Sequence, residues 1–180
     1  VFANMQFDGV VKTDKFHVAQ VIGDGVGVDN LYLNTRAGVK LLRDKPMEVS
    51  ADGVIGSVLY NNYNYKDLHI AGSYIGGDIE GHVVSNTDEN KFDLMADMNF
   101  SGRMKIDVQG VVDKLYLSPL MKVEQWNNPY LTTRINAQFE GANIDNIEGL
   151  AVIDSTSLYD ESFVYNPGPI YLQALAADDE

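Results

Sequence analysis

The feature that most constrains the fold is an alternation of apolar and polar residues that returns along nearly the whole chain. Successive side chains of a β-strand point to opposite faces, so this period predicts strands with one apolar and one polar face. Two short patterns carry it. An apolar residue, a polar residue and a glycine recur at Phe7-Asp8-Gly9, Ile79-Glu80-Gly81, Phe100-Ser101-Gly102, Phe139-Glu140-Gly141 and Ile147-Glu148-Gly149. A Tyr or His between two apolar residues recurs at Leu31–Leu33, Leu68–Ile70, Leu115–Leu117 and Ile170–Leu172.

The alternation extends these patterns into a series of expected strands. They are Ala3–Gly9, Lys15–Ile22, Asp29–Thr35, Met47–Tyr60, Tyr63–Tyr74, Asp78–Ser85, Lys91–Ser101, Met104–Gly110, Leu115–Leu117, Thr133–Gly141, Ile147–Asp154, Ser162–Asn166 and Ile170–Leu172. Their short spacing predicts an all-β, antiparallel meander, with all 180 residues in one domain.

Glycines and a break in parity punctuate the expected strands. Gly76-Gly77 is typical of a tight hairpin, and Gly53 and Gly56 indicate a bulge or bend. The apolar parity changes between Tyr65 and Leu68, which predicts an irregularity at Lys66-Asp67. Helical signals are weak. Two segments have room for a turn or two of helix, Ala37–Leu42 and Leu117–Trp126.

Charge and composition exclude several kinds of partner and site. The chain has 13 basic and 26 acidic residues, a formal net charge of −13, which argues against nucleic acid and against electrostatic binding to anionic membranes. The absence of cysteine excludes disulfides and thiolate chemistry. No apolar run approaches the roughly 18 residues of a membrane span. Both chain ends look cut, so we expect a fragment of a longer protein.

No group of residues predicts catalysis, a metal site or a cofactor. The three histidines, His17, His69 and His82, lie in different expected strands without a second ligand at metal-binding spacing. Asp78 and Glu80 share a strand face, as the acids of a glycosidase do, but solvated carboxylates explain them better. The glycines of Gly23–Gly27 lack the following helix that a phosphate loop requires. We therefore expect a protein that is not an enzyme.

Two turn segments contain oxygen ligands that suit calcium. Asp24, Asp29 and Asn30 form one group, and Asp88-Glu89-Asn90 the other, yet neither has the spacing of a calcium-binding loop. Turn chemistry is the better interpretation of both. Aromatic residues offer a different alternative. Tyr60, Tyr63, Tyr65 and Tyr74 are close in sequence, and such tyrosines either stiffen strands or bind sugars.

The apolar strand faces need to be shielded, and no amphipathic helix is predicted to cover them. One solution is a closed β-sandwich, barrel or jelly roll, which would act as an interaction or carbohydrate-binding module. The other is an open sheet that curls into a groove and uses its apolar face to bind a ligand.

One stretch of the chain resembles a known family. Tyr60–Tyr74, followed by Ile79-Glu80-Gly81 and Asn90–Ala96, is similar to the TamB proteins of the bacterial envelope, most of all to the large versions of Bacteroidota-type bacteria, as are Phe139–Gly141, Ile144–Gly149 and Ile170–Ala174. TamB proteins belong with the AsmA-like proteins that bridge the inner and outer membranes. The resemblance implies a β-taco, which is a long curled sheet with an apolar concave face. It also implies a periplasmic location, phospholipid transport and an outer-membrane assembly barrel of the TamA type as partner of the full-length protein.

The expected ligand is the acyl chain of a phospholipid, held by the alternating apolar residues. The predicted lining is Ile79, Val83, Phe92, Leu94, Ala96, Met98, Phe100, Met104, Ile106, Val108, Ile135, Ala137 and Phe139. Small residues on the same face, namely Gly81, Ala96, Ala137 and Gly141, are expected to leave room between bulkier ones. The free strand edges of such a sheet also predict pairing with a second copy in the isolated fragment.

Overall fold

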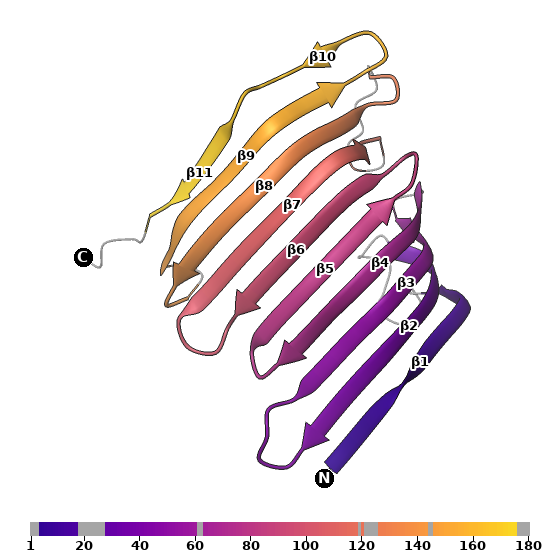
Figure 1. The fold of residues 1–180 in the computed structure, drawn as a ribbon, viewed down its shortest axis with the longest axis vertical. Coiled ribbons are helices and arrows are strands. Elements are labelled where there is room, and N and C mark those ends of the chain that lie inside the picture. Colours follow the sequence, from indigo (N-terminus) through magenta and orange to yellow (C-terminus); the bar gives the residue numbers. More distant parts are fainter. Residues whose placement is uncertain are drawn as a thin grey trace.

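The chain folds into one open antiparallel sheet, in which strands follow one another in sequence order (Figure 1). This computed structural model describes residues 4–17, 28–60, 63–118, 120, 126–143 and 146–175. The eleven strands are β1 (Asn4–His17), β2 (Val28–Leu42), β3 (Glu48–Tyr60), β4 (Tyr63–Ile75), β5 (Asp78–Asn86), β6 (Lys91–Asn99), β7 (Met104–Tyr116), β8 (Tyr130–Gly141), β9 (Ile147–Tyr159), β10 (Val164–Tyr165) and β11 (Ile170–Ala174). Both β10 and β11 pair with β9.

The all-β prediction is confirmed, and the closed alternatives are wrong. All eleven strands belong to a single sheet, and β1 at one edge does not pair with β10 or β11 at the other. Substantial contacts between strands are confined to neighbours in that sheet. A sandwich or jelly roll needs a second sheet packed face to face on the first. Among the described residues there is none, and no α-helix either.

Local irregularities occur where glycine and parity predict them. Gly76 and Gly77, with φ of 58° and 111°, form the turn between β4 and β5. Asp67 has a φ of 51°, which accounts for the parity change after Tyr65. Gly56 is the extra residue of a bulge, because the β2–β3 register shifts opposite it. Gly53 pairs regularly with Thr35 and makes no bulge.

The suggestion of a helix at Ala37–Leu42 is wrong. This segment is the end of β2, where Ala37, Val39 and Leu41 alternate with polar residues and pair with β1. The segment Leu117–Trp126 lies mostly outside the described residues. Two expected short strands, Met104–Gly110 and Leu115–Leu117, are one strand, β7, interrupted by a bulge between Val112 and Leu115.

The sheet has two unlike faces and two unlike ends. The register places the apolar members of each alternation on one face, the apolar face, and most charged residues on the other, the polar face. The hairpin end carries the short turns 43–47, 76–77 and 100–103, the end of β8 and the start of β9, which lie with the start of β1 along the lower left of Figure 1. The opposite end, called the loop end, carries the β5–β6 turn at 87–90.

Candidate functional site

The strand register brings the predicted lining residues together on the apolar face. Ile79 pairs with Met98, Val83 with Leu94, and Ser85 with Phe92, so β5 and β6 present one continuous set. The set continues across β7 and β8, where Ile106 pairs with Phe139, Val108 with Ala137, Gly110 with Ile135 and Met104 with Gly141. Twelve of the thirteen predicted residues therefore share a face, while their role in binding lipid stays a prediction.

Phe100 is the exception. It follows the end of β6 in the turn at the hairpin end, and its side chain is 49% exposed. Its backbone N–H donates to the carbonyl of Gly77 over 2.8 Å, which joins two neighbouring hairpin turns. Phe100 was predicted to line the groove because it continues the alternation of β6, but β6 ends one residue earlier, at Asn99.

A line of small residues crosses the apolar face perpendicular to the strands. Each member pairs with the next, from β1 to β6, and we call this set the small-residue row: Gly9, Ala37, Ala51, Gly72, Gly81 and Ala96. The same line then passes through Val108 to Ala137 and Ala151 on β7, β8 and β9. The sequence did not reveal this alignment, because it arises from strand pairing.

Bulkier apolar residues flank the small-residue row. Toward the hairpin end the paired residues are Phe7, Val39, Val49, Tyr74, Ile79, Met98, Ile106 and Phe139. Toward the loop end the line is mixed, because Thr35, Gly53 and Gly110 alternate with bulkier apolar residues; its members are Val11, Thr35, Gly53, Ile70, Val83, Leu94, Gly110, Ile135 and Ile153. The two flanking lines are four residues apart along each strand, about 13 Å at 3.3 Å per residue.

Most strand glycines on this face do not leave empty space. A Cβ on Gly110 would collide with the side chain of Leu94, and a Cβ on Gly9 would lie 2.9 Å from the Phe7 ring. A Cβ on Gly141 would lie 2.8 Å from the backbone of Ile147, so this residue does not make the room predicted for it. Gly81 differs, since nothing lies within 4 Å of a Cβ built there. A Cβ on Gly72, its neighbour in the row, would lie 2.9 Å from the backbone oxygen of Glu80, so among the glycines of the row only Gly81 on β5 has free space beside it.

Asn90 joins three strands at the loop end. Its side chain is 3% exposed, its Nδ2 donates to the Tyr63 hydroxyl over 3.0 Å, and its Oδ1 accepts from the Tyr116 N–H over 3.2 Å. Its backbone carbonyl accepts from the buried Ser85 hydroxyl at 3.0 Å. These bonds tie the start of β4, the β5–β6 turn and the end of β7 together.

The predicted tyrosine group does not form one platform. Tyr63 and Tyr65 make an edge contact at 4.7 Å between ring centroids, whereas Tyr74 lies near the other end of β4. Burial, followed by the hydrogen bond to Glu89, raises the pKa of Tyr63 to about 12. A separate pocket of about 450 Å³ at the loop end has different tyrosines in its wall, Tyr116, Tyr130 and Tyr159.

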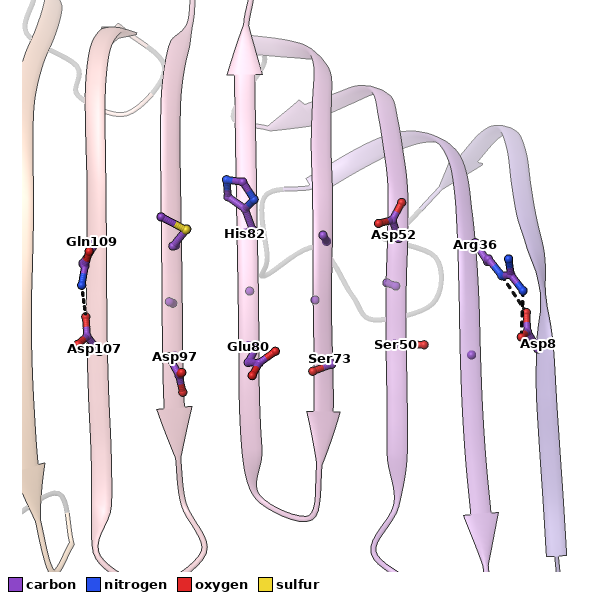
Figure 2. A pocket seen from close by; sticks show the side chains of 17 residues that line it. Asp8, Arg36, Ser50, Asp52, Ser73, Glu80, His82, Asp97, Asp107 and Gln109 are labelled. Carbon is purple, nitrogen blue, oxygen red and sulfur yellow. Dashed lines mark hydrogen bonds and ion pairs between the residues drawn. The ribbon is translucent and has the colours of Figure 1, made fainter.

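The polar face has a depression of about 680 Å³, shown in Figure 2. Acidic residues from several strands surround it, including Asp52, Glu80 and Asp97. Asp8 accepts from Arg36 at 3.0 Å, and this ion pair lowers the pKa of Asp8. The only signal in the sequence was that acids occupy the polar positions of each alternation. Four members of the small-residue row, Ala51, Gly72, Gly81 and Ala96, also line this depression, and the apolar groove that the resemblance implied stays a prediction.

The other candidate residues have structural contacts. His82 Nε2 lies 2.7 Å from Asp93 Oδ1 on the polar face, where His69 also lies exposed. Asp78 accepts from Asn99, and Glu89 from Tyr63. Gly23–Gly27 and Asp24 lie outside the described residues. Within the described ranges, no group of three or more His, Asp or Glu side chains has a geometry that suits a metal ion.

Comparison of this chain with known proteins gave no match. No protein-family model, curated protein or solved structure matches this chain. In the part of the chain that the structure describes, no helix is long and apolar enough to cross a membrane. The fold and the site define the class of this protein: it is a single open antiparallel sheet with one apolar and one polar face.

Proposed function

We propose that the apolar face binds acyl chains of phospholipids one molecule at a time, along the small-residue row. In this proposal the chain is a segment of a TamB-like bridge in the periplasm of the cell envelope, which serves phospholipid transport and outer-membrane assembly. The full-length protein would reach the outer-membrane barrel partner. The observation that carries the proposal is the unbroken pairing of small residues from Gly9 to Ala96, with a line of bulkier apolar residues on its hairpin side and a mixed, mostly apolar line on its loop side.

The dimensions of the row suit an acyl chain. Neighbouring strands are about 4.8 Å apart, so the six small residues extend over about 24 Å. A lipid tail is a flexible apolar rod without hydrogen-bonding groups, and the row offers a surface of matching character. The proposed orientation of the tail is therefore across the strands and along the long axis of the sheet.

Burial of methylenes supplies the binding free energy. About ten methylenes removed from water are worth about 8 kcal/mol at roughly 0.8 kcal/mol each, before the cost of immobilising the tail is subtracted. This interaction has no preferred direction, so a tail can slide along the row without breaking a specific bond. Weak, non-directional binding is what transport along a bridge requires.

The polar face supports the proposal in a different way. Its carboxylates, with the net charge of −13, keep a one-layer sheet soluble and oppose adsorption to anionic bilayers. An apolar face on such a chain is then available for single lipids rather than for a membrane surface.

Charge placed beside the row tests this function. A photoreactive residue at Met98 should crosslink to phospholipid in the parent protein, and Leu94→Arg should reduce the yield at least tenfold. Met95→Arg is the matched control. Met95 lies on the same strand, on the polar face and 51% exposed, so its replacement should leave the yield unchanged. The proposal is wrong if the parent gives no lipid adduct, or if a folded Leu94→Arg variant crosslinks as well as the parent.

A further inference from the structure

We infer that β1 is a pairing edge whose partner is β1 of a second copy of this chain, antiparallel to it, with Gly9 facing Gly9 across a two-fold axis. The inference concerns the isolated 180-residue chain rather than the longer bridge of the proposed function, and it stands on the geometry of the sheet edges. It specifies the register in which the two copies meet.

The edge formed by β1 is long, and its bulge, between Thr13 and Phe16, and its lysines, Lys12 and Lys15, are confined to its C-terminal part. Its 14 residues pair with β2 alone, and its backbone groups on the outer side have no partner strand among the described residues. Met5, Phe7 and Val10 are 41%, 46% and 59% exposed. Soluble proteins usually interrupt such edges with proline or a bulge. The β1–β2 pairing is regular from Asn4 to Thr13, and β1 contains no proline.

The opposite edge is protected. There β10 has two residues and β11 has five, and Pro167, Gly168 and Pro169 separate them. Gly168 has a φ of 78°, and the prolines cannot donate to a neighbouring strand. Pairing of β1 with this edge would be short, whereas pairing of β1 with β1 uses the full regular segment. The longer contact is isologous, so it closes as a dimer rather than growing into a fibre.

Side-chain parity limits the register. The apolar faces of the two copies are continuous only if residues of equal parity face each other, since a shift by one residue exchanges the faces. With Gly9 opposite Gly9, Phe7 faces Val11 on the apolar side, and Gln6 faces Lys12 on the polar side.

Neighbouring registers of the same parity are less favourable. If Asp8 faces Asp8, like charges lie directly opposite each other, which destabilises an antiparallel pair. If Val10 faces Val10, Gly9 faces Val11 and a bulky residue interrupts the small-residue row. The Gly9 register instead joins the rows of the two copies into one line of twelve small residues, six from each chain.

Charge sets the conditions for dimer formation. Each copy carries a net charge of −13, and β1 has only Lys12 and Lys15 to offset this. Repulsion between the copies is screened over about 10 Å at 0.1 M salt and about 3 Å at 1 M. The dimer fraction should therefore rise severalfold between low and high salt, measured by sedimentation velocity.

The absence of native cysteine permits a direct test of register. Under mild oxidation at high salt, Gly9→Cys should form a disulfide-linked dimer, and Val10→Cys and Tyr171→Cys should remain largely monomeric. A mixture of Phe7→Cys and Val11→Cys chains should crosslink far more than either alone, which also covers the case in which Gly9→Cys folds poorly. A chain that stays monomeric at high salt overturns the inference, as does preferential crosslinking at Val10 or Tyr171. Lipid crosslinking at Met98 is read separately, so either idea can fail alone.

Discussion

Gly81→Val tests both the openness of the row and its function. A Cβ at Gly81 meets nothing within 4 Å, and the backbone there has no positive φ that would exclude a branched residue. Glycine within a strand costs roughly 0.5–1 kcal/mol, and valine is among the residues that strands favour. We therefore expect Gly81→Val to raise the free energy of unfolding by about 1 kcal/mol in urea denaturation.

The same substitution should weaken lipid binding. Gly81 lies between Gly72 and Ala96 in the row, so a valine there stands in the path of the tail. Displacing about four methylenes at roughly 0.8 kcal/mol each loses about 3 kcal/mol, or about a hundredfold in Kd. Binding of a fluorescent fatty acid, together with photocrosslinking at Met98, measures this loss.

Ala71→Val is the matched control, because Ala71 is the neighbour of Gly72 on β4 and faces the depression on the polar side. It adds the same branched group to the opposite face, and lipid affinity should not change. The reasoning fails if Gly81→Val destabilises the protein by about 2 kcal/mol or more, since overpacking costs about 1–3 kcal/mol and would mean that the space is filled. It also fails if a folded Gly81→Val variant binds lipid as the parent does.

Three further predictions concern the loop end and the glycine contacts. Asn90→Ala leaves the backbone N–H of Tyr116 without its partner, whereas the Tyr63 hydroxyl keeps Glu89, and should lower stability by about 1–3 kcal/mol in urea denaturation; an exposed control, Asn64→Ala, should cost little, and equal costs would contradict the role of Asn90. The pKa of Tyr63 is raised from 10.0 to about 12, so the folded protein retains a proton that the unfolded chain releases, and stability should fall as the pH rises from 10 to 12. Tyr63→Phe should flatten this pH dependence, measured by denaturation at each pH, and an unchanged slope would assign it to another group. Leu94→Ala removes the half-buried side chain that covers Gly110 and should cost about 1–2 kcal/mol, a part of the cost for full burial; no loss of stability would show that this contact is weak.

Strand positions and local irregularities could be predicted because their causes are local. The alternation in Lys91–Ser101 identifies β6 to within two residues, and Gly76-Gly77 identifies the hairpin before β5. The irregularity at Asp67 could be predicted because one residue with a positive φ moves the apolar side chains that follow in β4 from odd to even positions. Each of these signals lies within a few residues of the feature it predicts.

Features that depend on the pairing of distant strands could not be predicted in the same way. The contacts of Asn90 join segments more than 20 residues apart, and the sequence shows Asn90 only as part of a polar turn. The sheet closes only if its first and last strands pair with each other, and a local sequence pattern carries no information about that pairing. The suggestion of a helix at Ala37–Leu42 was wrong because alanine, lysine and leucine favour a helix locally, and pairing with β1 and β3 overrides that preference.

The recurrent motif of an apolar residue, a polar residue and a glycine shows why register matters for function. At Phe7-Asp8-Gly9 the phenylalanine ring covers its own glycine, and at Phe139-Glu140-Gly141 the glycine lies against backbone. Only at Ile79-Glu80-Gly81, of these three, does the glycine open onto free space. Gly81 has a glycine and an alanine as cross-strand neighbours within the row, but so does Gly72, where a Cβ would lie 2.9 Å from the backbone oxygen of Glu80. Open space on this sheet therefore depends on the local path of each strand as well as on its cross-strand neighbours, so Gly72→Val should destabilise the protein where Gly81→Val does not.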